Sequence, residues 1–236
     1  MDTIVFTVCS RPSYLEEALS SWSAARGIQN WRVVFMIEPT PATKRQAEVI
    51  ENFRHPNKQL VFNSERLGVL VNPWAGLDKC FSSGAEFTIL AEEDVIVSSD
   101  VLEYFDFARG CSDDSTLAIC ANNRSALDES KVSEVCRLEK FDPLIWGTWS
   151  DQWHSVLRDT WDKDYSTGEG GHYAGWDHNI NRRLIPQHSK HVLFPHQSRS
   201  DHIGEIAGTH CVPEFFPETQ APCFVLDRAP LDYVLI

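Results

Sequence analysis

Three consecutive carboxylates, Glu92, Glu93 and Asp94, follow directly after an apolar segment, FTILA at residues 87–91. Adjacent like charges repel one another unless a cation compensates them. Carboxylate oxygens are ligands that Mg²⁺ and Mn²⁺ prefer, and such an ion commonly bridges one or two carboxylates to substrate phosphates. The same acids could instead form a solvated loop before the N-terminus of a following helix. Taken alone, the acidic run leaves both interpretations open.

The elements that must position these acids follow an alternating pattern in the first half of the chain. Apolar runs predict strands at residues 3–9, 31–39, 59–63, 87–91 and 116–122. Helices are predicted between them, one opening with a capping box at Ser13 and Glu16, one at 41–55, one capped by Asn72 and one opened by Ser99. The alternation predicts an α/β protein with a mainly parallel sheet flanked by helices.

Polar side chains stand at the ends of several predicted strands. Arg11 follows the first strand, Glu38 lies at the end of the second, and the acidic run follows the fourth. In an open parallel sheet, ligands bind outside the carboxyl ends of the strands. Arg11 and Glu38 could hold a base and a ribose through charge-assisted hydrogen bonds, or could only form a surface ion pair or cap a loop.

The second half of the chain is rich in aromatic residues. Five of the eight tryptophans lie there, and helices are predicted near residues 150–161 and 176–185. Trp146 and Trp149 could stack against sugar rings, although core packing is the alternative. The glycine-rich segment 167–171 could be a lid or an ordinary connector. We predict one domain over residues 1–236, with a nucleotide-type sheet in its first half and an aromatic-rich second half.

Charge and hydropathy exclude some classes of protein. A formal net charge of −13 argues against a protein that coats nucleic acid. Residues 178–200 nevertheless contain no acid, and Arg199 in this stretch could bind a diphosphate or belong to a solvated basic face. No segment approaches the roughly 20 apolar residues of a transmembrane helix, and the N-terminus does not resemble a secretory signal. We therefore expect a cytoplasmic protein without membrane insertion.

Several motifs in order resemble glycosyltransferases of the GT-A fold, the Rossmann-like fold of nucleotide-diphospho-sugar transferases. The acidic run and the following VSSDVLEYF resemble the E-D-D segment of the N-acetylglucosaminyltransferase I family and its helix. The same family has similar landmarks at C-S-R (9–11), at Glu38, at W-G-T-W (146–149), at W-D-H (176–178) and at S-R-S-D-H-I-G (198–204). The resemblance covers roughly residues 3–210, and it implies a nucleotide-sugar-binding half at 1–125 and an acceptor-binding half with the catalytic base at 126–236.

This resemblance implies a role for each acid of the run. Asp94 would bind Mn²⁺ or Mg²⁺, Glu93 would face the ribose, and Glu92 would face the donor sugar. Glu93 stands where the family has aspartate, so its longer side chain could alter the ribose contact. Arg11 matches the arginine that contacts uracil, and Glu38 matches a base-contacting aspartate.

The resemblance further implies an inverting transfer from a UDP-sugar, with GlcNAc or Glc as the sugar. Asp177 is the candidate general base, and His178 takes that role if the second acid of the family's W-D-D-W is the true counterpart. His202 or His210 could supply a further metal ligand, as in some GT-A enzymes, although a loop or core histidine is the alternative.

Two other functions remain open. Metal-dependent nucleotidyl transfer would need a basic, glycine-rich loop after the first strand, and C-S-R-P is too short for one. A catalytically inactive protein that binds a sugar nucleotide is the non-enzymatic alternative. For an enzyme, a bacterial or phage protein acting on a glycan, a protein or a modified DNA base fits the composition. The oligomeric state is open.

Overall fold

The computed structural model describes residues 1–125, 128–163, 175–206 and 213–236. Two sequence-based predictions lie outside these ranges, the lid at residues 167–171 and the metal-ligand role of His210. Among the described residues, no helix combines the length and the apolar character that crossing a membrane requires.

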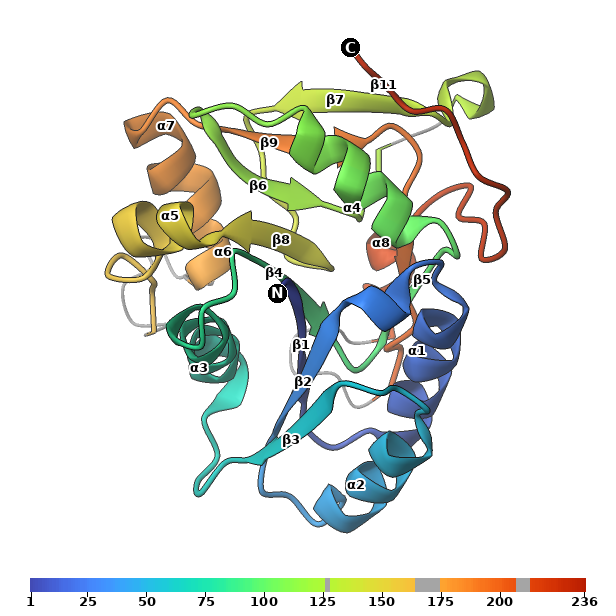
Figure 1. The fold of residues 1–236 in the computed structure, drawn as a ribbon, viewed down its shortest axis with the longest axis vertical. Helices are drawn as coiled ribbons and strands as arrows, with labels where there is room; N and C mark the ends of the chain where they lie inside the picture. Colours follow the sequence, from blue (N-terminus) through green and yellow to red (C-terminus); the bar gives the residue numbers. More distant parts are fainter. Residues whose placement is uncertain (126–127, 164–174, 207–212) are drawn as a thin grey trace.

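Within the described residues, nine strands form one continuous sheet, in the order β11-β7-β9-β6-β8-β4-β1-β2-β3 (Figure 1). Two further strands, β5 and β10, pair with each other in a small second sheet. The strands are β1 (Thr3–Val8), β2 (Arg32–Ile37), β3 (Lys58–Phe62), β4 (Phe87–Glu92), β5 (Val95–Val97), β6 (Thr116–Cys120), β7 (Glu134–Leu138), β8 (Trp146–Trp149), β9 (His191–Pro195), β10 (Ser200–His202) and β11 (Val234–Leu235).

Parallel pairing dominates the sheet, which confirms the predicted fold class. β1 pairs in parallel with both β2 and β4, and β2 pairs in parallel with β3. β8 lies antiparallel between β4 and β6, where the sequence pattern predicted no strand. The central strands are apolar on both faces because helices cover both sides of a parallel sheet.

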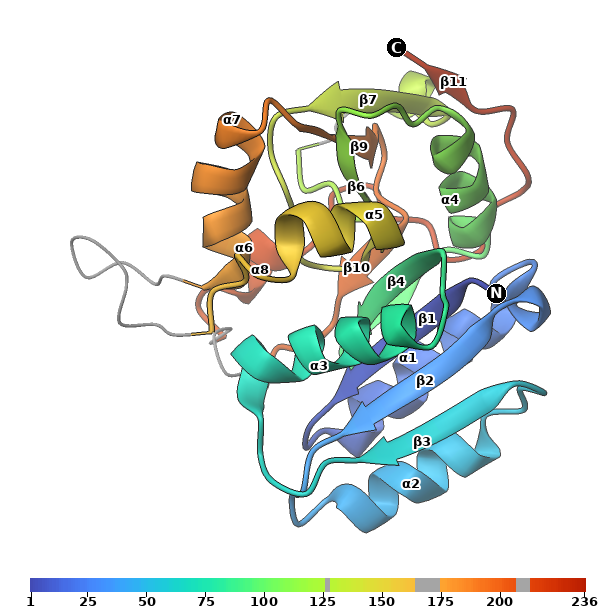
Figure 2. The ribbon, with the colours of Figure 1, turned by 60° about the vertical axis from the view of Figure 1, so that its left-hand side comes forward.

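Two apolar cores lie on opposite faces of the sheet. On one face, helices α1 (Pro12–Ala24), α2 (Thr43–Asn52) and α4 (Val101–Gly110) pack against Phe6 and Phe35. On the other face, α3 (Gly68–Ser82) packs against Val5 and Val34, and Figure 2 shows it in front of the sheet with α2 behind. A Cβ atom on Gly76 would lie 2.9 Å from Cγ2 of Val5, so glycine allows α3 to approach β1 closely.

The second half of the chain adds short helices to the α3 side of the sheet. They form two runs, α5 (Ser150–Gln152) with the π-helix η3 (Trp153–Leu157), and α6 (Trp176–Asn179) with the π-helix η6 (Ile180–Leu184) and α7 (Ile185–Gln187). Their apolar side chains belong to the α3 core. Two 3-10 turns, η1 (Ile28–Asn30) and η2 (Glu129–Lys131), and one short helix, α8 (Phe216–Thr219), complete the described elements.

Two helix starts differ from the predicted ones. α1 begins at Pro12 and makes no side-chain cap, because proline is suited to the first helical position and places Ser13 inside the helix. α3 begins at Gly68, four residues before the predicted cap Asn72. The Asn72 side chain instead donates to the backbone oxygen of Met36 at 3.3 Å and accepts from Asn63 at 2.9 Å.

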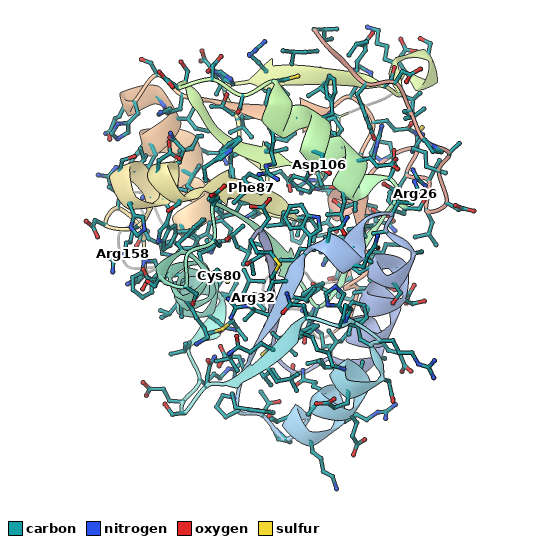
Figure 3. All side chains as sticks on the ribbon, viewed as in Figure 1. Arg26, Arg32, Cys80, Phe87, Asp106 and Arg158 are labelled. Carbon is teal, nitrogen blue, oxygen red and sulfur yellow. The ribbon has the colours of Figure 1, made fainter. Side chains whose placement is uncertain are left out.

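The C-terminal segment, residues 213–236, returns across the helices of the first half. Its Leu226 oxygen accepts from the backbone amide of Ser99 at 2.8 Å, and its last strand, β11, extends the sheet beside β7. Arg26, in the turn after α1 and labelled in Figure 3, forms an ion pair with Glu103 of α4 at 2.6 Å and donates to the backbone oxygen of Arg228 at 2.7 Å. The segment is therefore attached to the turn after α1 and to the residues just before α4.

Candidate active site

The three acids lie where the central strand β4 ends. Glu92 is its last residue, and Glu93 and Asp94 form the turn into β5. β10 pairs antiparallel with β5 and places His202 opposite Val95. The backbone amide of Ile203 donates to the backbone oxygen of Asp94 at 2.9 Å. The short β5–β10 sheet thus brings residues 94 and 202, far apart in the chain, to one point.

Asp94 is a buried carboxylate, 3% exposed, with one oxygen that has a partner and one that has none. Its Oδ2 lies 2.7 Å from Nη1 of Arg11 and 3.0 Å from Nε2 of His202. Its Oδ1 has no hydrogen-bond partner in the described part of the chain. Burial alone would raise the pKa of Asp94, but the His202 hydrogen bond and the Arg11 charge outweigh it and hold that pKa below its ordinary value.

The donor set around Asp94 fits a hard divalent cation. A buried carboxylate oxygen without a partner is unfavourable, and a cation would compensate it. Imidazole nitrogen is a second common ligand. The ranges that the structure describes contain no group of three or more ligating side chains. An ion here would therefore complete its coordination with substrate phosphates and water, which is usual for Mg²⁺.

Gly204 closes one side of the Asp94–His202 pair. A Cβ atom on this glycine would lie 2.7 Å from Nε2 of His202 and even closer to Oδ2 of Asp94. Only a glycine allows the backbone to run so near both side chains. The chain after β10 thus encloses the two candidate ligands.

Glu93 is 1% exposed and all of its hydrogen-bond partners are protein groups. Its two oxygens accept from the backbone amides of Cys9 (2.8 Å) and Ser10 (3.2 Å), and from side-chain nitrogens of Arg11 (2.9 Å) and Gln46 (3.2 Å). These four bonds fix the loop after β1 to the end of β4. Glu93 was expected to face the ribose, and the structure places it beneath the Arg11 loop.

The cluster raises the pKa of both Glu92 and Arg11, which favours the neutral form of the acid and the charged form of the arginine. Removal from water and the like charge of Asp94 raise the pKa of Glu92 to about 8. Burial would lower the pKa of Arg11, but Asp94 and Glu93 outweigh that effect and raise it. The cluster therefore keeps one cation charged and favours the neutral form of one of its acids.

A pocket of approximately 440 Å³ opens beside the cluster. The ends of β1, β2 and β4, the start of α3 and Lys163 line it, with Arg11, Glu38 and Glu92 among its residues. Glu38 is 1% exposed and accepts from the backbone amides of Leu67 (2.9 Å) and Gly68 (2.8 Å). Its carboxylate therefore fixes the pocket wall at the start of α3.

Sequence reasoning missed two cations of this pocket, Arg66 and Lys163. Arg66 is exposed and lies 4.0 Å from Sγ of Cys9. It belongs to the loop after β3, so the rule that ligands bind beyond strand ends, extended to that strand, could have found it. Lys163 places its Nζ 3.3 Å from the ring centre of Trp74, and burial lowers the pKa of this amine. No sequence signal pointed to Lys163.

Asp177 begins α6 next to the same pocket wall. The indole nitrogen of the preceding Trp176 donates to the backbone oxygen of Val69 at 3.3 Å. Its ring stacks on that of Trp161 with the ring centres 4.6 Å apart. Asp177 is among the charges that raise the pKa of Glu92, so it lies within electrostatic range of the cluster. Its carboxylate makes no hydrogen bond or ion pair with the described residues. His178 follows it on α6 and is likewise half-buried.

Comparison with known proteins identifies the fold. No protein-family model matches the sequence, and no curated protein matches it. Among solved structures, the mannosyltransferase PcManGT from Pyrobaculum calidifontis, in complex with GDP-Man and Mn²⁺, superposes with a TM-score of 0.61 and 14% identity over 92% of this chain and 67% of that one. GalNAc-T7 with UDP, GalNAc and Mn²⁺ superposes with a TM-score of 0.63 and 12% identity over 88% of this chain and 44% of that one.

TarS from S. aureus, residues 1–349 in complex with UDP-GlcNAc, is a third similar structure. Its TM-score is 0.56 with 12% identity over 85% of this chain and 58% of that one. All three superpose on more than four fifths of this chain with TM-scores above 0.5. This chain has the GT-A fold. It spans about half the length of the GalNAc-T7 and TarS chains.

Of three further residues predicted for the GT-A site, Trp146 and Arg199 are buried in the interior, and Trp149 is half-buried against the core. Trp149 pairs with Phe87 at the start of β4, the end of that strand farthest from Glu92. Trp146 is fully buried among aromatic rings, and its ring centre lies 4.9 Å from that of Phe141. Arg199 is also fully buried, so its guanidinium offers no surface to a diphosphate. We therefore leave these three residues out of the proposed site.

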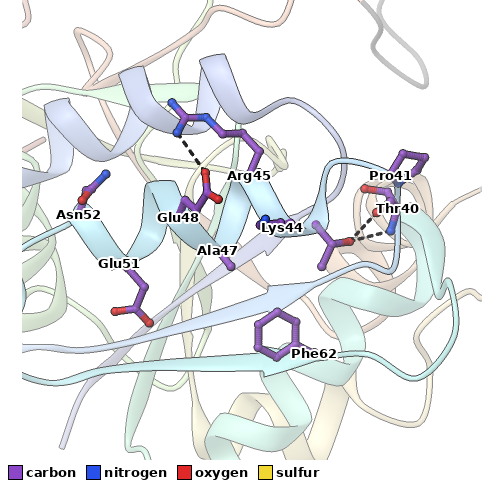
Figure 4. Close-up of a pocket in the computed structure, with 10 residues that line it drawn as sticks. Thr40, Pro41, Lys44, Arg45, Ala47, Glu48, Glu51, Asn52 and Phe62 are labelled. Carbon is purple, nitrogen blue, oxygen red and sulfur yellow. Dashed lines mark hydrogen bonds and ion pairs between the residues drawn. The ribbon is translucent and has the colours of Figure 1, made fainter.

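A second hollow of approximately 970 Å³ lies between α2 and β3 (Figure 4). Lys44, Arg45, Glu48 and Glu51 of α2 line it together with Phe62, and Arg45 pairs with Glu48 at 3.4 Å. It contains none of the residues that the motifs single out. Its wide, mixed-charge lining contrasts with the buried cluster at the end of β4.

Proposed function

We propose that this chain is a metal-dependent glycosyltransferase that moves a sugar from a nucleoside-diphosphate donor to an acceptor hydroxyl. The observation that carries the proposal is Asp94, a buried carboxylate whose Oδ1 has no hydrogen-bond partner among the described residues and whose Oδ2 lies 3.0 Å from an imidazole nitrogen. This pair lies beside a pocket at the carboxyl ends of the central strands, where α/β sheets bind ligands. The similar structures hold GDP-Man, UDP or UDP-GlcNAc, and two also hold Mn²⁺, which supports a nucleotide-sugar donor and a metal.

Asp94 and His202 would hold Mn²⁺ or Mg²⁺. When bound, the ion supplies positive charge that stabilises the departing diphosphate. Arg11 already neutralises Oδ2 of Asp94 and leaves Oδ1 open. A bound ion would compensate the charge of this open oxygen.

The pocket would bind the nucleotide half of the donor. Arg11 lies at its edge with the raised pKa of a permanent cation, and Arg66 and Lys163 add positive groups suited to a diphosphate. Glu38 would contact the base while it holds the wall at the start of α3. Glu92, whose neutral form is favoured, would donate or accept a hydrogen bond at the donor sugar. We retain a UDP-sugar, with GlcNAc or Glc, as the finer prediction.

Asp177 would act as the general base that takes the proton of the acceptor hydroxyl, and a direct attack would then invert the anomeric centre. Its carboxylate is not engaged by the described residues, and it lies within electrostatic range of Glu92. His178, one position later on α6, is the alternative base.

A panel of donors tests the reaction class. UDP-GlcNAc, UDP-glucose, UDP-galactose and GDP-mannose are each incubated with the protein and Mn²⁺, and free nucleotide is measured with and without chelator. We expect slow, chelator-sensitive hydrolysis of one donor, because water can replace an absent acceptor. Failure of every donor to bind in the presence of metal would contradict the proposal.

The base is tested with Asp177→Asn and His178→Asn on the donor that the panel selects. Loss of a general base lowers the rate by about 10²–10⁴-fold while donor affinity is kept. We expect this result for Asp177→Asn and a small change for His178→Asn. Proton NMR of the released sugar reports the anomeric configuration, and a retained configuration would contradict the inverting mechanism.

A further inference from the structure

The side chain of His202 is held at both ring nitrogens. Its Nε2 lies 3.0 Å from Oδ2 of Asp94, and its Nδ1 lies 2.7 Å from Oγ1 of Thr219 in α8. The residue is 5% exposed, and its ring packs against that of Phe216 with centroids 5.7 Å apart. The orientation of the imidazole is therefore set by Asp94 on one side and by the C-terminal segment on the other.

The hydroxyl of Thr219 is placed to accept the hydrogen of Nδ1. A hydroxyl has a single hydrogen to donate, and the backbone oxygen of Phe216, 2.7 Å away, can accept it. The Thr219 oxygen can then accept from Nδ1 whenever Nε2 binds an ion. A metal-binding histidine commonly donates its other ring N–H in this way. Nε2 is the nitrogen directed toward Asp94, and without an ion it donates to Oδ2 of that carboxylate.

Thr219 is itself held in place by the surrounding chain. The backbone amide of Ala221, two residues later, donates to Oδ1 of Asp201 in β10 at 2.7 Å. Asp201 directly precedes His202. The Thr219–His202 and Ala221–Asp201 bonds therefore join α8 and the residues just after it to the strand that carries the candidate ligand. A further bond, from the Ser99 amide to the Leu226 oxygen at 2.8 Å, fixes the segment that follows.

We propose that Thr219 is a positioning residue of the metal site, which holds His202 with Nε2 directed toward the ion. This inference rests on the proposed function because it takes Asp94 and His202 as the ligands. Loss of such an outer partner typically lowers metal affinity by about 10–100-fold. Metal binding would then depend on a segment that none of the sequence motifs includes.

The test compares Thr219→Val, Thr219→Ser and the neighbouring control Gln220→Ala in the full chain. Mn²⁺ binding in the presence of UDP is measured by the loss of the free-ion EPR signal, and pulsed EPR detects ¹⁴N coupling from a coordinated imidazole. We expect Thr219→Val to lower Mn²⁺ affinity about 10–100-fold and to weaken the ¹⁴N coupling. Thr219→Ser and Gln220→Ala should keep both wild-type values, because serine retains the hydroxyl and Gln220 is exposed.

Each outcome separates this inference from the proposed function. Wild-type affinity and ¹⁴N coupling in Thr219→Val would overturn the role of Thr219 and leave the metal site intact. Wild-type protein that binds Mn²⁺ without ¹⁴N coupling would overturn His202 as a ligand, and the inference with it. Wild-type protein that binds neither Mn²⁺ nor UDP would overturn both proposals. A loss in Thr219→Ser equal to that in Thr219→Val would assign the effect to packing and also overturn the inference.

Discussion

Glu92 and Glu93 are neighbours in the chain but have different surroundings. Glu93 accepts four hydrogen bonds, two of them from backbone amides of the loop after β1. The side chain of Glu92 makes no hydrogen bond with the described residues, and its surroundings raise its pKa to about 8. The first acid of the run is therefore suited to contact a ligand, whereas the second acid holds the loop that carries Arg11.

Glu93→Gln should destabilise the protein and displace that loop. The amide nitrogen of glutamine cannot accept, so at least one buried donor loses its partner at a cost of about 1–3 kcal/mol in the free energy of unfolding. Urea denaturation of the metal-free protein measures this change. Glu92→Gln is the matched control and should leave the stability at pH 7 unchanged, because the neutral form of Glu92 is already favoured. Equal stability of the two variants would contradict these roles.

At the residue scale, the sequence predicted which residues lie close together better than it predicted what each of them contacts. The rule that ligands bind beyond strand ends brought Arg11, Glu38 and Asp94 together, and the structure places all three around one pocket and its adjoining cluster. The same reasoning could not show that Glu38 and Glu93 are engaged by backbone amides. It also could not show that Arg199 is buried, since a motif match contains no information on exposure.

Stacked tryptophans connect the pocket wall to the candidate base. Trp161 and Trp176 stack at 4.6 Å with their planes 15° apart, and their indole nitrogens donate to the oxygens of Leu70 and Val69. These two acceptors lie in the first turn of α3, which lines the pocket. Since Asp177 follows Trp176 directly, the stack fixes the distance between the wall and the carboxylate.

Trp161→Phe should loosen this connection while it keeps an aromatic ring in place. The Leu70 oxygen would lose its 2.8 Å hydrogen bond, at a cost of about 1–3 kcal/mol in the free energy of unfolding. We also expect several-fold weaker donor binding, measured by calorimetry. Trp149→Phe is the control, because Trp149 contacts Phe87 at the far end of β4 and should leave donor affinity unchanged. An effect of Trp149→Phe on donor affinity equal to that of Trp161→Phe would contradict the role of the stack.

At the element scale, long periodic segments were predicted and short ones were missed. Strands β1 to β4 and the helices between them agree with the apolar pattern to within a few residues, the start of α3 being the largest error. β5 and β8 have three and four residues, too few for a period to be recognised. Their pairing depends on contacts distant in the sequence, and β5 is the strand whose pairing with β10 brings His202 to Asp94.

A buried polar network attaches the C-terminus to the rest of the molecule. Asp100, at the start of α4, accepts from Arg199 at 3.0 Å and from the Tyr233 hydroxyl at 2.6 Å, and both Asp100 and Arg199 are fully buried. Arg199 also donates to the Val132 oxygen at 2.6 Å. Through these bonds, the start of α4, the loop before β10 and the last residues of the chain hold one another in place.

Arg199→Met should destabilise the whole molecule without a specific effect on the donor. Removal of Arg199 takes away the closest cation of the buried Asp100 and leaves Arg228 at 3.9 Å, at a cost of about 3–5 kcal/mol in the free energy of unfolding. The double variant Asp100→Asn with Arg199→Met should recover part of this loss, as urea denaturation would show. Weaker diphosphate binding by a fully stable Arg199→Met protein would instead return Arg199 to the donor site.

The most direct test of the metal-dependent donor site is calorimetric binding of the selected nucleotide sugar, with Mn²⁺ or with chelator, to wild type, Asp94→Asn and Asp106→Asn. Asparagine keeps the shape of the Asp94 side chain but removes the charge that an ion requires. Asp106, exposed on α4, is the matched control. We predict Mn²⁺-dependent binding by wild type and Asp106→Asn, and loss of that dependence in Asp94→Asn. Donor binding that is equally strong with chelator, or unchanged in Asp94→Asn, would contradict a metal site at Asp94.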